Sequence, residues 1–124
     1  EEQAQAWGFP WPGSVPVAHW ISEGEDVGIP GIDLRVIHTP GHSPGSVTFV
    51  TPEGLIVGDV LFRSSVGRTD LPGGDWPTLG RSGRERLFTF PAETRVCPGH
   101  GPETTIGLEI RTNPFVGEPA FEGA

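Results

Sequence analysis

The sequence lacks several residue types on which whole classes of proteins depend. It contains no lysine and no tyrosine, and its 8 basic residues, all arginine, are outnumbered by 16 acidic ones, which gives a formal net charge of −8. Proteins that bind nucleic acids carry a basic patch or stripe, and helices that lie on membranes carry cationic residues along one face. We therefore expect neither a nucleic acid nor a membrane as a partner of this chain.

Cysteine, methionine and long apolar runs are equally scarce. Cys97 is the single cysteine, which excludes an internal disulfide and any zinc site built from several cysteines of this chain. Because a chain without disulfides is typical of a reducing compartment, we expect a cytoplasmic protein. No run reaches the roughly 18 apolar residues of a transmembrane helix. Since methionine is absent throughout, we also expect the chain to derive from a longer or processed product.

Glycine and proline, by contrast, are abundant, with 19 and 14 of the 124 residues. Such a content occurs in disordered chains, but here these residues separate short apolar runs, and no repeat is visible. We interpret them as the turns of a β-rich unit that is about one domain in size.

The apolar runs predict several strands, followed by a helix, a further strand and a last helix. Five runs predict strands, at residues 17–21, 32–37, 46–50, 55–57 and 94–97. Two segments predict helices, at residues 82–88 and from Thr104 or Thr105 to Thr112. Residues 1–6 are typical of a helix end, residues 64–78 of a long loop and residues 116–124 of a loose tail. The order predicts a single layered α/β (α+β) unit over residues 1–124.

Three of the turns each present a side chain of the kind that binds metals. They are TPGHSPG around His42, VGD ending at Asp59, and CPGHGP around His100. In each turn an apolar run stops at Gly or Pro, so a rigid strand would end beside a small residue that lets the backbone approach a metal closely. Imidazole nitrogens suit zinc and iron, and a carboxylate can bridge two ions. We predict that these three residues are metal ligands, against the alternative that each is an ordinary turn residue.

Five motifs follow one another along the chain. They are residues 39–45 (TPGHSPG), 58–62 (GDVLF), 66–70 (VGRTD), 98–102 (PGHGP) and 104–115 (TTIGLEIRTNPF). Together they resemble the metallo-β-lactamase superfamily, and most closely its small glyoxalase II-like (hydroxyacylglutathione hydrolase-like) hydrolases. The resemblance runs from about Trp7 to Phe115. It implies an αββα sandwich with metals at the edge between two sheets.

The resemblance also implies a role for each matching position. His42 would bind the first metal, His100 the second, and Asp59 would bridge both and take part in catalysis. The implied reaction is hydrolysis of a small-molecule thioester by a metal-bound hydroxide, because metal ions lower the pKa of bound water toward about 7 and polarise the carbonyl. The implied cofactors are two divalent metal ions, zinc first, with iron and manganese as alternatives.

One part of the family pattern is missing. The family carries four further ligands in an earlier His-x-His-x-Asp-His segment, whereas this chain has only His19 before position 38. The resemblance therefore implies that the chain is the C-terminal half of the domain. The N-terminal half would be supplied by the same polypeptide or by another chain.

Two other functions stay open at this point. A persulfide dioxygenase on the same fold uses a single iron, and its family shares the Gly-Arg-Thr-Asp run at residues 67–70. A non-catalytic fragment or interaction module would keep the fold without the reaction. Metal content and substrate separate these alternatives from the hydrolase.

Several residues near the motifs have plainer interpretations. We expect His38 to support its turn and not to bind metal, and Cys97 to pack at a strand end. Arg68 and Asp70 would pair to pin the long loop or would line the mouth of a substrate site. Thr105 would cap the last helix.

Overall fold

The computed structural model describes residues 21–28 and 30–120. Its main element is a mixed five-stranded sheet. Its strands, in the order β1-β2-β3-β6-β7, are β1 (Arg35–His38), β2 (Val47–Thr51), β3 (Gly54–Gly58), β6 (Arg95–Pro98) and β7 (Thr104–Thr105). All neighbours are antiparallel except β3 and β6, which are parallel. The predicted α/β (α+β) class is confirmed. The predicted helix end at 1–6 and most of the predicted strand at 17–21 lie outside the described residues.

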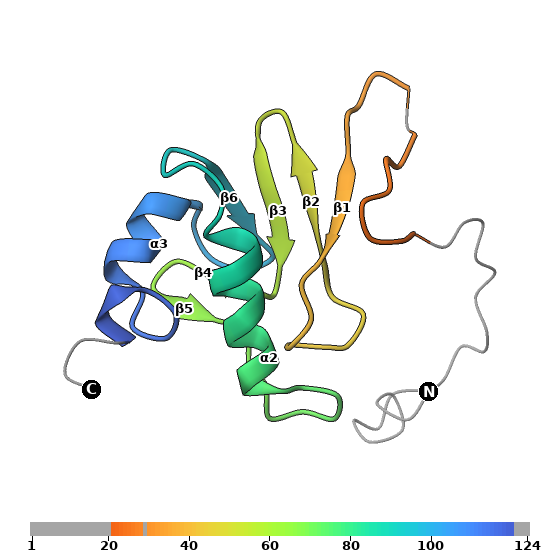
Figure 1. The fold of residues 1–124 in the computed structure, drawn as a ribbon. Coiled ribbons are helices and arrows are strands. Elements are labelled where there is room, and N and C mark those ends of the chain that lie inside the picture. The colour runs from red at the N-terminus through yellow and green to blue at the C-terminus, as the bar shows by residue number, and fades with distance from the viewer. Residues whose placement is uncertain (1–20, 29, 121–124) are drawn as a thin grey trace.

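The strand directions bring three chain segments to the same edge of the sheet. Because β1 and β3 are each antiparallel to β2, they run the same way, and β6 is parallel to β3. The arrows of these three strands point in one direction in Figure 1. Their carboxyl ends, and the turns that follow them, therefore lie along a common edge. These are the turns that carry the three predicted ligands.

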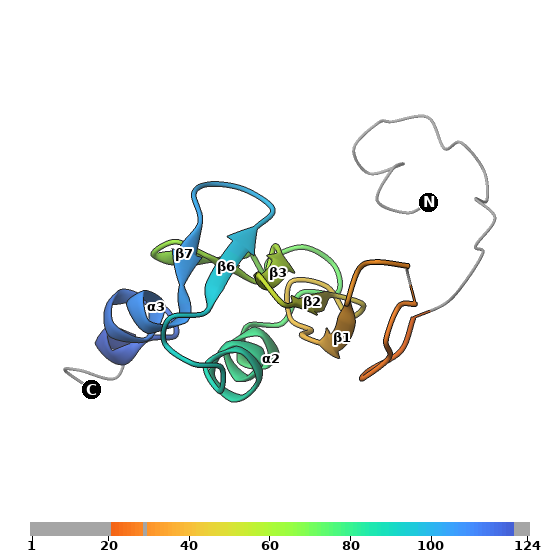
Figure 2. The same cartoon turned by 90° about the horizontal axis from the view of Figure 1, so that it is seen from above.

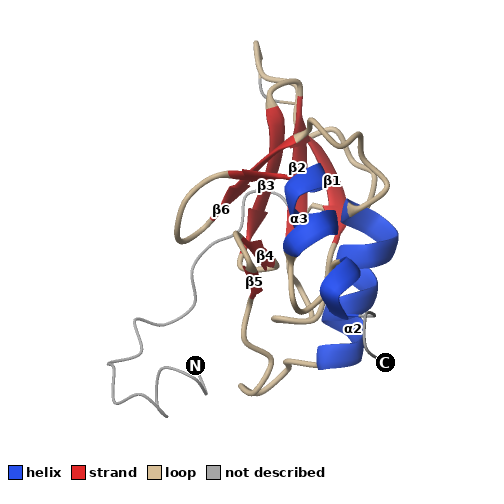
Figure 3. Ribbon diagram, turned by 90° about the vertical axis from the view of Figure 1, so that its left-hand side faces the viewer, coloured by secondary structure: helices blue, strands red, loops and turns tan. Residues whose placement is uncertain are grey.

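Alternation along the strands divides the sheet into a buried and an open face. In β3, Leu55 and Val57 belong to the hydrophobic core, whereas Ile56 between them is 46% exposed. Successive side chains of a strand point to opposite faces, so the core lies on one side only. Both labelled helices pack on that same side of the sheet, as Figures 2 and 3 show. The result is one sheet layer and one helix layer, which is half of the predicted αββα sandwich.

The first helix begins earlier than the sequence predicts. Helix α2 (Trp76–Arg81) continues directly into a π-helical turn, η1 (Ser82–Leu87), whereas we predicted a helix over 82–88. The carboxylate of Asp75 accepts the N–H of Thr78 at 3.1 Å, and a proline lies in the first turn. This capping by Asp75 stabilises a helix start that the surrounding glycines and prolines conceal. No helix in the described part of the chain has the length and apolar character needed to cross a membrane.

A second small sheet occupies part of the predicted loop 64–78. Strands β4 (Leu61–Phe62) and β5 (Ser65–Val66) form an antiparallel hairpin directly after Asp59. The strands are only two residues long, too short for a hydrophobic pattern to reveal them. The long loop is therefore shorter than predicted at both ends.

The last helix matches the prediction, but the tail does not. Helix α3 (Ile106–Thr112) begins at Thr105, whose hydroxyl accepts the N–H of Leu108 at 3.2 Å, and it ends at Asn113. The loose tail predicted from residue 116 is wrong for residues 116–120. Val116 is 2% exposed within the core, and a 3-10 turn, η2 (Glu118–Ala120), follows it. The remaining residues of the predicted tail, 121–124, lie outside the described residues.

Candidate metal centre

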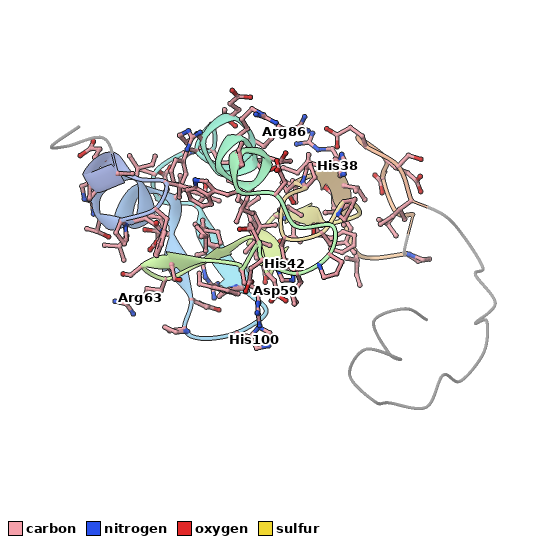
Figure 4. The ribbon with its side chains drawn as sticks, turned by 90° about the horizontal axis from the view of Figure 1, so that it is seen from below. His38, His42, Asp59, Arg63, Arg86 and His100 are labelled. Carbon is pink, nitrogen blue, oxygen red and sulfur yellow. The ribbon has the colours of Figure 1, made fainter. Side chains whose placement is uncertain are left out.

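The three predicted ligands meet at the carboxylate of Asp59. Its Oδ2 lies 3.5 Å from Nε2 of His42, and its Oδ1 lies 3.0 Å from Nδ1 of His100. Figure 4 shows the three side chains beside one another, from His42 through Asp59 to His100, and apart from His38 and Arg86. Each carboxylate oxygen thus faces a different imidazole. A carboxylate placed in this way is suited to bridge two metal ions.

A main-chain carbonyl fixes the tautomer of His42. Its Nδ1 lies 2.8 Å from the carbonyl oxygen of Arg68. Because a carbonyl oxygen can only accept, Nδ1 must donate, and the lone pair of the neutral ring is then on Nε2, the atom that faces Asp59. A metal-binding histidine is commonly oriented by such a bond from its second nitrogen. The ring is therefore held ready to bind a metal through Nε2.

The turn that carries His42 is tied to helix α2 and to its own base. The N–H of Asp75 donates to the carbonyl of Gly41 at 2.8 Å, and the hydroxyl of Ser82 donates to the carbonyl of Pro40 at 2.6 Å. At the base, Nε2 of His38 donates to the carbonyl of Pro44 at 2.7 Å. His38 therefore closes the turn and lies apart from the candidate ligands, which agrees with the supporting role expected for it.

Asp59 and His100 lie side by side because β3 and β6 are neighbours. The N–H of Gly99 donates to the carbonyl of Gly58 at 2.7 Å, which joins the two turns just before their ligands. The ring of Phe62 in β4 contacts the ring of His100 edge to face, with centroids 6.0 Å apart. Apart from these contacts the imidazole is open, since the side chain of His100 is 77% exposed. The centre is therefore closed on the His42 side and open on the His100 side.

The donor atoms of this centre are of the types that bind metals, but there are too few of them to complete a metal site. Imidazole and carboxylate are common ligands of zinc and iron, which bind four or more donors. Within residues 21–28 and 30–120, no group of three or more His, Cys, Asp and Glu side chains is arranged to hold a metal ion. Each of two ions would find one imidazole and one carboxylate oxygen here. The described residues thus make a partial centre that needs further ligands.

A second feature, an apolar hollow, adjoins the loop that supports His42. Its volume is about 440 Å³, and its walls are Val66, Gly67, Arg68, Thr69, Asp70, Trp76 and Phe115. The guanidinium of Arg68 donates twice to Asp70, at 2.7 and 2.8 Å. The pair therefore forms as expected and pins the loop, and both residues also line this hollow. That the hollow is the mouth of a substrate site stays a prediction.

The ion pair with Arg68 lowers the pKa of Asp70 from 3.8 to about 2, chiefly through its hydrogen bonds. We expect an NMR titration of the Asp70 carboxyl carbon to show a midpoint of about 2, and the midpoint to return toward 3.8 in Arg68→Gln. Because the pKa of the folded state lies below the ordinary value, the pair stabilises the fold at neutral pH. This contribution is lost as the pH falls below 3.8 toward 2. A native midpoint of 3.8 would contradict the pairing.

The half-buried thiol of Cys97 is bonded to a neighbouring carboxylate. Its Sγ donates to Oε1 of Glu103 at 3.7 Å, and Arg95 binds the same carboxylate. Burial, with the adjacent Glu103, raises the pKa of the thiol, so the reactive thiolate is disfavoured. The raised pKa agrees with the expectation that Cys97 is not reactive, but the side chain is half-buried on the face opposite the core and is not buried in it, as the packing expectation required.

The sequence interpretation missed two supports of the centre, the Phe62 ring and the Arg68 carbonyl. A backbone carbonyl leaves no trace in composition, and an apolar ring after Asp59 is an ordinary core residue in sequence. Both lie within the quoted motifs 58–62 and 66–70, which are the only signals that single them out.

Comparison with known proteins agrees with this geometry. The family model described as "Metallo-beta-lactamase superfamily" matches residues 2–100. A curated relative, hydroxyacylglutathione hydrolase GloC of Haemophilus influenzae, is 41% identical over 118 residues, which are 93% of this chain and 56% of that protein.

Two solved structures have folds similar to that of this chain. TTHA1623 in a di-iron-bound form is 50% identical, with a TM-score of 0.77 over 92% of this chain and 56% of that one. The BLEG-1 B3 metallo-beta-lactamase is 41% identical, with a TM-score of 0.83 over 93% of this chain and 56% of that one. This chain spans about half the length of the curated relatives it matches. The family match and the partial metal centre lead to one conclusion: the chain belongs to the metallo-β-lactamase superfamily.

Proposed function

We propose that this chain is the C-terminal half of a metal-dependent hydrolase that cleaves a small-molecule thioester. The observation that carries the proposal is the Asp59 carboxylate between the imidazoles of His42 and His100. The likeness to a protein named hydroxyacylglutathione hydrolase supports a thioester as the substrate class. The single free cysteine supports a cytoplasmic location.

Each residue of the centre has a defined task in this proposal. His42 presents the lone pair of Nε2, Asp59 offers one oxygen to each side, and the exposed His100 leaves room for a substrate. Two divalent ions bound here would lower the pKa of water and polarise a carbonyl. Zinc is our first candidate, and the di-iron form of a similar structure supports iron as well.

The open face of the sheet supports a second half-domain as the partner. Phe49, Ile56 and Cys97 lie in register across β2, β3 and β6 on the face opposite the helices. Ile56, in the central strand, is 46% exposed, although covering an apolar side chain of this size stabilises a fold by about 1.5–3 kcal/mol. We propose that the N-terminal half, from the same or another polypeptide, covers this face and brings the missing ligands.

The proposal is tested on the complete protein, in which this chain is joined to its N-terminal half. We expect two metal ions per molecule and release of a free thiol from hydroxyacyl thioesters such as a hydroxyacylglutathione. This chain alone, incubated with the same metal, is the control and is expected to be inactive. Hydrolysis by the isolated chain at the rate of the complete protein would contradict the proposal that this chain carries only half of the site. A complete protein that binds no metal would contradict the proposed metal-dependent function.

A persulfide dioxygenase is the second candidate. The run that this family shares, Gly67 to Asp70, is the segment whose Arg68 carbonyl orients His42. The same complete protein distinguishes the two activities. A single iron per molecule, with oxygen uptake in the presence of glutathione persulfide and no thioester cleavage, would favour the dioxygenase.

A further inference from the structure

The β4–β5 hairpin and the loop that follows it connect to all three candidate ligands. It begins two residues after Asp59, its Phe62 contacts the ring of His100, and the Arg68 carbonyl that follows it orients His42. The N–H of Gly67 donates to the carbonyl of Val60 at 3.3 Å, which closes the base of the hairpin. A shift of this small element would therefore move both imidazoles relative to the carboxylate.

A buried carboxyl group holds the turn of that hairpin. Oε1 of Glu109 accepts the N–H of Ser64 at 2.8 Å and the side-chain amide of Asn113 at 2.9 Å. Its Oε2 accepts the hydroxyl of Thr104 at 2.6 Å. The amide of Asn113 also donates to the carbonyl of Ser65 at 3.0 Å. The hairpin is thus fixed by side chains of α3 and its C-cap, far along the sequence.

Burying the polar side chains of this network costs free energy, which a role in filling the core alone would not explain. Glu109 and Asn113 are both 0% exposed, and burying polar groups costs free energy that a leucine in the same space would not incur. The bonds of Glu109 include one to Ser64, which has a φ of 62°, a left-handed conformation that non-glycine residues rarely adopt. The network therefore specifies one conformation of the hairpin.

We propose that Glu109 is a positioning residue for the metal centre. It acts through the hairpin, whose Phe62 ring contacts His100 and whose second strand leads into the Arg68 carbonyl that orients His42. This inference rests on the proposed function, since it concerns the same centre.

The test compares two variants of the complete protein by the affinity for zinc, measured in competition with a chelating dye. Glu109→Leu leaves the Ser64 N–H and one N–H of the Asn113 amide without an acceptor, because that amide keeps only its bond to the Ser65 carbonyl. We expect zinc to bind about 10 to 100 times more weakly. Glu109→Gln keeps an acceptor for both donors, and its amide can donate to the Thr104 hydroxyl. We expect its affinity to stay within about threefold of the parent protein.

A matched control separates positioning from loss of stability. Val36 is buried in β1, outside the core cluster and the hairpin, so Val36→Ala destabilises the fold without touching the network. At a temperature where all variants are folded, Val36→Ala is expected to keep the zinc affinity and the visible spectrum of the cobalt-loaded protein. Glu109→Leu is expected to change both. Equal affinities and spectra in Glu109→Leu and Val36→Ala would overturn the proposal.

If Glu109→Leu does not fold, a second variant tests whether the hairpin positions the metal centre. Phe62→Leu removes the ring that contacts His100 but leaves an apolar side chain in the half-buried site. We expect weaker zinc binding and an altered cobalt spectrum, and an unchanged pair of readouts would overturn the positioning role of the hairpin. A parent protein that binds neither metal would contradict the proposed function itself, which is a distinguishable result.

Discussion

Replacing Asp59 with alanine is expected to lower the thioester turnover of the complete protein by more than about 100-fold, even when one metal remains bound. The carboxylate is the one group that faces both imidazoles, through a different oxygen in each case. Without it, two ions would lose their common ligand and the spacing that this ligand imposes. Steady-state hydrolysis and metal analysis of the same sample measure the two effects together.

Replacing each candidate histidine tests which residues hold the metal ions. In His42→Ala, and separately in His100→Ala, we expect metal content to fall by about half or more, because one of the two ions loses its imidazole in each variant. Glu53→Ala is the matched control, since Glu53 is an exposed carboxylate in the turn at the opposite end of the β2–β3 hairpin from Asp59. It should keep full metal content and turnover. Full metal occupancy in both histidine variants would refute their assignment as ligands, and unaltered turnover in Asp59→Ala would refute the bridging role.

Gly67→Ala is expected to disrupt the centre and to lower the free energy of unfolding by about 2 kcal/mol or more. A Cβ added at Gly67 would lie 1.7 Å from the carbonyl oxygen of Asp59 and 3.2 Å from Nδ1 of His42. The first contact is with backbone and cannot be relieved by turning a side chain. The loop must therefore move away, and the Arg68 carbonyl that orients His42 moves with it.

Gly45→Ala is the control for this second prediction. Gly45 lies in the turn that carries His42, but a Cβ there would meet nothing within 4 Å. We expect its denaturant midpoint and metal content to match those of the parent protein. If Gly67→Ala also matched the parent in both measurements, the close approach of the loop to Asp59 would be contradicted.

Much of the fold was predictable from local signals. The β2–β3 hairpin, the strand at β6 and the cap at Thr105 follow from alternation, turn residues and capping preference, which act over a few residues. The start of α2 was missed because Asp75 lies among glycines and prolines that favour a loop. The burial of Val116 was missed because it joins a core cluster made by residues distant in sequence, contacts that local sequence does not encode.

For the centre, the sequence by itself determined the kinds of donor and the turns that present them: two imidazoles and a carboxylate, each at the end of an apolar run beside glycine or proline. Their convergence was decided only by the tertiary structure. Parallel pairing of β3 with β6, and the common direction of β1, bring three turns from distant parts of the chain to one edge. The supports of that edge, the Arg68 carbonyl and the buried Glu109, depend on backbone position and long-range hydrogen bonds, and no local pattern fixes these.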